Sequence, residues 1–181
     1  MKPTKQNLAV VAGTTYRDTV RLMQPVWVYK PITSISGAPV QLVVPDHELP
    51  DSWPVWATGV SGMPAINRDP VRQSPHRGSR LDANTVVIHG LSATGLKPTG
   101  GELMYRLPID LTGCTVRMRI GDLLLTDGAG LTVHAHGTVE RELTPEQTQA
   151  LADGWQYSFE VEFADGSLIR FFEGGQGGCC A

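Results

Sequence analysis

Two histidines have the spacing of metal ligands. His134 and His136 lie two residues apart in a run that alternates apolar and polar residues, and on a strand that spacing directs both imidazoles to one face. A metal site needs one or two further ligands, and no matching carboxylate or thiol motif accompanies the pair. We therefore expect two histidines that face solvent, with no metal and no other cofactor.

Two other segments hold groups that serve acid–base or nucleophilic catalysis. Asp46-His47-Glu48 stands between two prolines, and Ser61 lies in Gly59-Val60-Ser61-Gly62. The serine does not fit Gly-x-Ser-x-Gly, and Pro64 opposes the helix that must follow a nucleophile elbow. No nucleophile motif accompanies the Asp-His-Glu triplet, which we interpret as a polar turn. The sequence thus predicts no catalytic site and a protein that is not an enzyme.

The segment 67–80 is the most basic stretch of the chain. It contains Arg68, Arg72, Arg77 and Arg80, together with His76. We interpret it as a long exposed loop, because it is polar and has no strand pattern. Its cations could bind an acidic partner surface or a phosphate. The alternative is a solvated loop whose charge is balanced by nearby aspartates.

Tryptophans form a second candidate surface. Trp53 and Trp56 flank Pro54, and Trp27 lies two residues after Pro25. If exposed, Trp53 and Trp56 could stack on sugar rings or anchor a protein interface. The alternative is that they belong to the core of a small β domain.

Length and composition limit the class of protein. The chain has 181 residues, 20 Gly, 13 Pro and a net charge of −3. This composition favours short strands joined by turns and leaves no net positive field to hold nucleic acid. No apolar run is long enough to cross a membrane as a helix. Three cysteines form no disulfide framework. We expect Cys114 to be buried, while Cys179 and Cys180 could bridge back to Cys114, bridge to another chain or stay unpaired.

Alternating apolar and polar residues predict mostly strands, with one short helix. The helix is expected after Thr144, an N-cap residue followed by Pro145 and by Gln147 at the capping-box position. Asp165-Gly166 is expected to form a hairpin turn. The expected strands lie at 8–12, 19–29, 40–44, 55–60, 85–88, 116–120, 131–135, 157–163 and 168–172.

The outer parts of the chain resemble a known domain. The run Asn7-Leu8-Ala9-Val10-Val11-Ala12-Gly13-Thr14-Thr15-Tyr16 is similar to the opening strand of the immunoglobulin-type domain of phage baseplate upper proteins and fibre-attachment proteins. The later half of such domains has a Leu-Thr-Gly motif, an Arg-rich strand, a capped helix and an Asp-Gly hairpin. Here Leu111-Thr112-Gly113, residues 116–120, residues 143–148 and Asp165-Gly166 follow in that order.

The interior, residues 33–104, resembles a different module. Asp46-His47-Glu48-Leu49, Gly62-Met63-Pro64-Ala65-Ile66-Asn67 and Gly100-Gly101 occur in the order of similar motifs in a small β-barrel. That barrel is the first catalytic-cysteine half-domain of ubiquitin-activating enzymes. The resemblance implies the fold and not the chemistry, because no cysteine lies in this range.

Together the two resemblances imply an all-β protein. An immunoglobulin-like β-sandwich (1–32 and 105–181) would carry an inserted small β-barrel (33–104) and one short helix. The implied function is that of a structural component of a phage virion, at the tail tip, the baseplate or the fibre attachment site, assembled in the host cytoplasm. Its partners would be other virion proteins and further copies of itself in a homo-oligomer, with no nucleic acid and no membrane insertion.

Two alternatives accompany this expectation. One is a head-decoration or head-fibre protein, and the other is a carbohydrate-binding module that contacts host glycan through Trp53 and Trp56. The candidate interface residues are Trp53, Trp56, Arg68, Arg72, Arg77, Arg80, Cys179 and Cys180.

Overall fold

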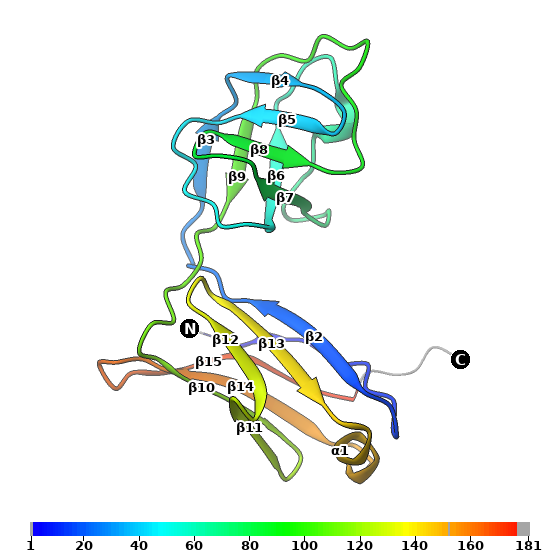
Figure 1. The fold of residues 1–181 in the computed structure, drawn as a ribbon, viewed down its shortest axis with the longest axis vertical. Coiled ribbons are helices and arrows are strands. Elements are labelled where there is room, and N and C mark those ends of the chain that lie inside the picture. Colours follow the sequence, from blue (N-terminus) through cyan, green and yellow to red (C-terminus); the bar gives the residue numbers. More distant parts are fainter. Residues whose placement is uncertain (1, 152, 177–181) are drawn as a thin grey trace. The chain divides into compact units, whose positions relative to one another are not determined.

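The computed structural model describes residues 2–151 and 153–176 and divides into two compact units (Figure 1). The first unit consists of Met1–Leu22 and Pro108–Ala181, and the second of Met23–Leu107. Strands build both units, and α1 (Pro145–Ala150) is the one α-helix within the described ranges. Over the same ranges, no helix has the length and apolar character needed to span a bilayer. The prediction of an all-β fold with one short helix is confirmed.

The boundaries between the units differ from the expected ones at 32/33 and 104/105. The chain leaves the first unit after Leu22 and returns to it at Pro108. The reason is that the strand expected over 19–29 is two strands in different sheets: β2 (Tyr16–Arg21) and β3 (Val28–Pro31). Pro25 lies between them and cannot donate to a strand ladder.

The first unit is an eight-stranded sheet curled over one core, in the order β1–β15–β14–β10–β11–β12–β13–β2. In Figure 1, the layer of β2, β13 and β12 lies over the layer of β10, β14 and β15. Inward residues of both layers share one apolar cluster, with Val20 and Val139 from the first layer and Met118 and Phe159 from the second. The other strands of this unit are β1 (Thr4–Lys5), β10 (Thr115–Ile120), β11 (Leu123–Asp127), β12 (Gly130–His134), β13 (Thr138–Leu143), β14 (Gln156–Glu162) and β15 (Leu168–Gly175).

Two local predictions in this unit are confirmed. The Thr144 hydroxyl accepts a hydrogen bond from the Gln147 N–H, and the Gln147 side chain accepts one from the Thr144 N–H, which completes the capping box of α1. The chain turns at Asp165 and Gly166, and β14 and β15 on either side of this turn pair antiparallel. In both places neighbouring residues satisfy each other's backbone groups, so the sequence is sufficient to predict them.

The strand expected at 8–12 is wrong. Leu8 forms an isolated bridge with Gln176, and the strand in this part of the chain is β1, which pairs parallel with β15. Leu8 and Val10 are nevertheless buried in the core of the unit. The apolar run therefore marks burial correctly but does not mark a strand.

The second unit is a seven-stranded sheet, in the order β3–β9–β6–β7–β8–β5–β4, that closes into a small barrel. Its end strands β3 and β4 are consecutive in the chain, and the residues between them bond to both neighbours. Ile32 N–H donates to Gly101 O at 3.0 Å, and Thr33 N–H donates to Val43 O at 2.9 Å. The other elements of this unit are β4 (Ser34–Ser36), β5 (Val40–Val43), β6 (Trp53–Thr58), the 3-10 helix η1 (Pro64–Ile66), β7 (His76–Arg80), β8 (Thr85–Ile88) and β9 (Glu102–Tyr105).

The corner at 62–67 and the glycine pair at 100–101 meet at one residue of the barrel wall. The Asn67 side chain accepts a hydrogen bond from Val60 N–H at 3.0 Å and donates one to Val60 O at 2.8 Å. Gly101 has a φ of +92°, and a Cβ there would lie 2.5 Å from Val60 Cγ2. Only glycine fits this backbone conformation and this close approach. Both motifs therefore hold Val60.

The long loop expected at 67–80 is wrong in its second half, where β7 forms. This strand pairs with β6 through Val55 and with β8 through Ile88. Its sequence lacks the β-branched and aromatic residues typical of strands, so the neighbouring strands decide its conformation. A Cβ on Gly78 would lie 3.0 Å from a Val86 methyl and 3.1 Å from a Val55 methyl, so a larger residue here would require these side chains to shift.

Candidate functional site

The histidine and serine candidates do not gather at one place. His134 and His136 are both exposed in the first unit, as expected, and His134 Nε2 lies 3.2 Å from Glu140 Oε1. Ser61 belongs to the second unit, where its backbone bonds to Thr99 in an isolated bridge. Across residues 2–151 and 153–176, no group of three or more His, Cys, Asp or Glu side chains is arranged to hold a metal.

His47 is buried, whereas the sequence indicated a polar turn residue. Its Nδ1 accepts a hydrogen bond from Leu49 N–H at 3.0 Å, and its Nε2 lies 2.9 Å from Asp82 O. An Nδ1 that accepts leaves the proton on Nε2, which then donates to Asp82 O, so the imidazole is neutral. The Tyr105 hydroxyl donates to His47 O at 2.6 Å. His47 thus fastens its turn to the barrel wall.

The second unit is expected to lose stability in mild acid. Burial lowers the pKa of His47 and that of His76, whose Nε2 lies 2.8 Å from Ile66 O. Both folded-state pKa values lie below the value of about 6.5 of an unfolded histidine. Between the two values the unfolded chain binds more protons, so stability is full above about pH 6.5 and falls as the pH drops towards the folded-state values.

Urea unfolding of the second unit at about pH 7.5 and about pH 5, followed at the Trp53 indole resonance, measures this loss. His47→Gln should reduce the difference between the two pH values. His89→Gln, which changes an exposed histidine of the same unit, is the matched control. An unchanged pH difference in the His47 variant would contradict the assignment.

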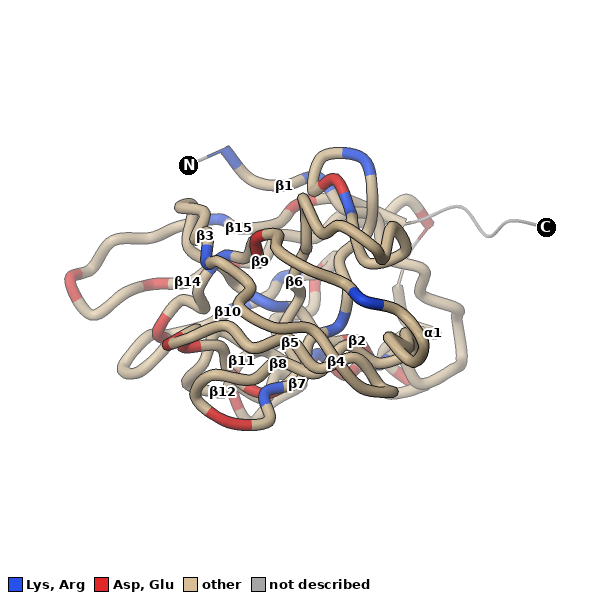
Figure 2. The backbone as a smooth tube through the Cα atoms, turned by 90° about the horizontal axis from the view of Figure 1, so that it is seen from above, with Lys and Arg blue, Asp and Glu red and all other residues tan. Residues whose placement is uncertain are grey.

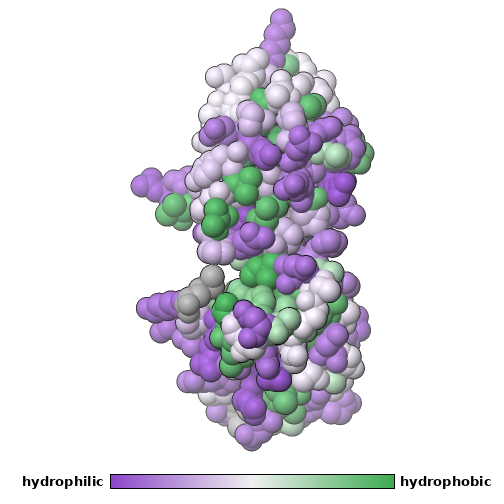
Figure 3. All heavy atoms as spheres, turned by 90° about the vertical axis from the view of Figure 1, so that its left-hand side faces the viewer, coloured by the Kyte–Doolittle hydropathy of each residue, from purple (hydrophilic) through white to green (hydrophobic). Residues whose placement is uncertain are grey.

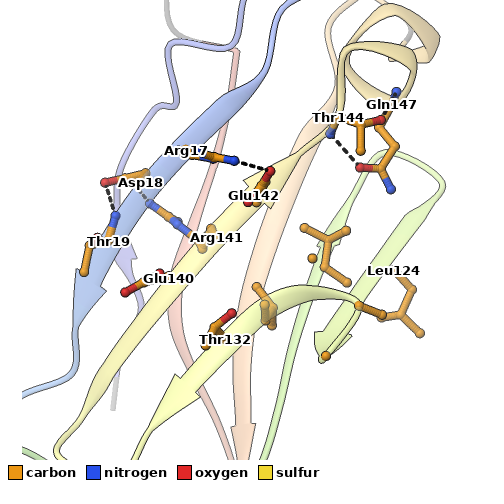
Figure 4. Close-up of a pocket in the computed structure, with 15 residues that line it drawn as sticks. Arg17, Asp18, Thr19, Leu124, Thr132, Glu140, Arg141, Glu142, Thr144 and Gln147 are labelled. Atoms are coloured by element: carbon orange, nitrogen blue, oxygen red, sulfur yellow. Dashed lines mark hydrogen bonds and ion pairs between the residues drawn. The ribbon is translucent and has the colours of Figure 1, made fainter.

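A cleft of about 770 Å³ lies in the first unit, over β2, β12, β13 and the start of α1 (Figure 4). Its carboxylates already have basic partners. Glu142 bonds to Arg17 at 3.0 Å, and Glu140 lies 3.2 Å from His134. Asp18 and Arg141 form an ion pair across the neighbouring strands β2 and β13. These pairs join strands to one another, so we assign them to the stability of the sheet.

A second cleft, of about 560 Å³, is lined by residues of β1, β10, β14 and β15. Of its basic residues, Arg170 lies 2.7 Å from Glu160 and 3.7 Å from Glu173. Lys5 and Arg119 also line the cleft, and Arg119 is exposed on β10 with no ion pair among the residues that the structure describes.

Trp53 and Trp56 lie on opposite sides of the barrel wall. Burial alternates along β6, with Trp53 on the inward side and Trp56 on the outward side. Trp53 is 1% exposed, and its indole N–H donates to Arg106 O at 2.7 Å. Trp56 is half-buried, and its indole N–H donates to Gln73 O at 3.0 Å. The expectation that Trp53 is an interface residue is therefore wrong, and the two rings do not form one stacking platform.

Other rings and two arginines share the outer side of the barrel with Trp56. The strand register places Tyr29, Met104 and Trp56 side by side on β3, β9 and β6. Trp27 is two residues before Tyr29 and Arg106 is two residues after Met104, so each lies on the same side as its neighbour in the row. Pro54, two residues before Trp56, pairs with Arg77 of β7. We call this set the aromatic face; it consists of Trp27, Tyr29, Pro54, Trp56, Arg77, Met104 and Arg106.

Three side chains at the centre of the aromatic face hold one another. The rings of Trp27 and Trp56 meet edge to face, with centroids 5.3 Å apart and planes at 73°. The Cζ of Arg106 lies 4.5 Å from the centroid of the Trp27 ring, in cation–π geometry. Because these side chains are already ordered, binding to them costs less conformational entropy.

The aromatic face is apolar without being core. Met104 is 9% exposed but lies outside the core cluster of the barrel, flanked by Tyr29 and Trp56 on the adjacent strands. Tyr29 is 54% exposed, and Val26, next to Trp27, is 67% exposed. On the side of this unit where β3 lies, Figure 3 shows a group of hydrophobic residues among hydrophilic ones.

The four arginines of residues 67–80 have different surroundings. Arg77 joins the aromatic face, where its Nε donates to Ser52 Oγ at 2.6 Å. Arg68 holds the loop by donating to Ser74 O and Pro75 O at 2.9 and 2.8 Å. Arg72 lies 3.8 Å from Asp69, and Arg80 lies at the end of β7. Figure 2 shows basic and acidic residues interspersed along the chain.

His76 and Cys114 both differ from their expected surroundings. His76, expected to add positive charge to the basic segment, is buried and its pKa is lowered. Cys114 is only partly buried, where full burial was expected, and it has no disulfide within residues 2–151 and 153–176. Cys179 and Cys180 lie outside the described residues.

Sequence reasoning missed Tyr29, Met104 and Arg106. The alternation of residues 27 and 29, and of 104 and 106, was a signal that each pair shares a side of its strand. Bringing the two pairs together requires the register between β3 and β9, which no local pattern specifies. The result is a preorganised surface of aromatic rings, a thioether and guanidinium groups. In comparisons with known proteins the chain matches no family model, no curated protein and no solved structure.

Proposed function

We propose that this chain is a structural component of a phage virion that acts by docking, at the tail tip, the baseplate or the fibre attachment site. The observation that carries the docking mechanism is the aromatic face, with its Trp27–Trp56–Arg106 centre. The virion assignment is supported by the resemblance of the outer strands to the immunoglobulin-type domain of baseplate proteins.

The composition of the aromatic face favours a macromolecular partner. Trp, Tyr, Arg and Met are enriched at the centres of protein interfaces, where a few anchored side chains carry most of the binding free energy. Here the two indole rings are fixed by each other and by hydrogen bonds or cation–π contact, and Tyr29 beside them is exposed. Such a surface supports docking onto another protein of the particle.

The glycan-binding alternative loses the residue pair on which it depended. It required Trp53 and Trp56 to be exposed together, and Trp53 is in the core of the barrel. A head-decoration or head-fibre role remains a second proposal within the virion, since the same surface would serve docking there. The position of the protein in the particle separates the two.

Gold-labelled antibodies against the recombinant protein test the proposal on particles from the source culture. We expect label at the tail tip or the baseplate in electron micrographs, and label on heads would instead support the head alternative. Particles without label, from a lysate in which the antibody detects the protein, would overturn the virion assignment.

A homo-oligomer is part of the same proposal. Light scattering of the purified protein with and without reductant measures its mass in solution. A defined oligomer that persists in reductant is expected. An oligomer that dissociates in reductant would attribute the association to cysteine, and a monomer would leave assembly to the partner.

A further inference from the structure

We propose that the aromatic face binds an acidic segment of a protein partner, one that presents an apolar side chain next to carboxylates. This inference rests on the docking function above and specifies the chemistry of the partner. Three observations carry it: the excess of positive charge at one end of the face, the fixed position of Arg106, and the apolar row beside it.

Two arginines of the aromatic face, Arg77 and Arg106, lie at the same end of it, beside Pro54 and Trp27. Arg68 and Arg72 lie in the neighbouring loop, whose Gln73 O accepts a hydrogen bond from the Trp56 indole. Of these four arginines, Arg72 is the one with an ion pair among the described residues. A partner with carboxylates would therefore meet guanidinium groups that are not yet neutralised.

The opposite end of the face is acidic, which gives the occupant a direction. Glu102 stands two residues before Met104 on the same side of β9, opposite Pro31 and Thr58 of the flanking strands. The carboxylates of the partner therefore belong at the Arg106 end, with its apolar side chain over Met104, Tyr29 and Trp56.

The guanidinium of Arg106 is held by stacking. It lies over the Trp27 ring, and its buried Nε has no hydrogen-bond partner among the residues that the structure describes. A planar guanidinium fixed in this way is weakly hydrated and loses little freedom when it binds a carboxylate, to which it can donate two parallel hydrogen bonds. Lysine at the same position would lack this geometry.

The balance of basic and acidic side chains in each unit favours the second unit as the one that binds an acidic partner. The second unit carries seven basic and six acidic side chains, whereas the first carries eight basic and twelve acidic. Long-range attraction of a negatively charged segment is thus directed to the second unit.

The test uses the full-length chain and a synthetic pentapeptide with blocked ends, in which a leucine is flanked by two glutamates on each side. The readout is the set of four indole N–H resonances in an NMR titration. Trp27 and Trp56 are expected to shift in a saturable way. Trp155, buried in the core of the first unit, is the internal control and should not shift.

Substitutions locate the binding charge. Arg106→Gln combined with Arg77→Gln should weaken peptide binding about tenfold, because the carboxylates lose both of their partners. Arg77→Gln alone changes a residue exposed on β7 and gives a partial effect if the double variant fails to fold. Glu102→Gln should not weaken binding, and Arg119→Gln, an exposed strand arginine of the first unit, should leave it unchanged.

Several outcomes would overturn the proposal. Equal binding of the matched glutamine peptide would show that carboxylates are not recognised, and an equal loss in Arg119→Gln would show non-specific charge. Indole shifts with a neutral oligosaccharide such as maltohexaose, and none with the peptide, would make the face a glycan site. Shifts that depend on protein concentration without peptide would show that a second copy covers the face.

The failure of this inference and that of the proposed function are distinguishable. Peptide binding without antibody label on particles would keep the acidic-segment chemistry and reject the virion role. Label on particles without peptide binding would do the reverse.

Discussion

Asp18→Asn is expected to destabilise the first unit by about 3–5 kcal/mol, because it leaves a buried guanidinium without its counter-charge. The side chain of Arg141 is 0% exposed, and Asp18 is its ion-pair partner across β2 and β13. Tyr16 OH also donates to Asp18 Oδ2, at 3.1 Å. Although partial burial opposes it, Arg141 holds the pKa of Asp18 below its usual range.

The same pKa shift gives the sign of an acid effect. The stability that Asp18 contributes is fully present above the unfolded aspartate pKa of about 3.9, and it is lost as the pH falls through the lower folded-state value. Asp18→Asn should remove this component of acid denaturation, since an amide does not titrate.

Urea unfolding followed at the indole resonance of Trp155 measures the change in free energy for the first unit. Glu142→Gln is the matched control, since it breaks the exposed pair with Arg17 and should cost below about 1 kcal/mol. The double variant Asp18→Leu, Arg141→Met should recover most of the lost stability, because it removes both buried charges. A single-variant loss no greater than that of Glu142→Gln would contradict the assignment.

Trp53→Ala is expected to destabilise the second unit by about 3–5 kcal/mol, the usual cost of truncating a large buried ring. The ring is fully buried in the barrel core, and its N–H satisfies Arg106 O at 2.7 Å. Trp56→Ala should cost roughly 1 kcal/mol, because this half-buried ring loses less apolar area.

Urea unfolding of the second unit measures the loss of stability in each variant. The hydrogen exchange of buried backbone amides of β5 and β8 serves as the readout that compares the two variants. Trp155→Phe, in the other unit, is the control for the loss of an indole. Equal losses from Trp53→Ala and Trp56→Ala would contradict their placement on opposite sides of the wall.

This pair of tryptophans shows what sequence patterns can and cannot predict. Residues an odd number of positions apart on a strand point to opposite faces, so the spacing of 53 and 56 already excluded a shared platform, provided that the segment is one regular strand. The alternation in 116–120 and the capping box at Thr144 were read correctly for the same local reason.

The elements that sequence patterns did not predict depend on pairing between strands far apart in the sequence. β7 forms from a sequence without strand formers because β6 and β8 offer it hydrogen bonds on both sides. Leu8 and Val10 are buried in the core of the first unit, and this burial accounts for their apolar character without a strand. Within the described structure, only Leu8 of the two takes part in a bridge. The aromatic face needs the register of four strands, which depends on how the barrel closes.

The two crossings of the chain between the units are neighbours in space. On the first unit's side, Ile109 N–H donates to Leu22 O at 3.0 Å, and on the second unit's side Gln24 N–H donates to Leu107 O at 2.8 Å. Each unit also has an apolar core of its own. The barrel therefore has the properties of a cassette: a short turn could replace it without breaking the sandwich. Because the two cores share no residue, substitutions that repack one unit leave the packing of the other intact.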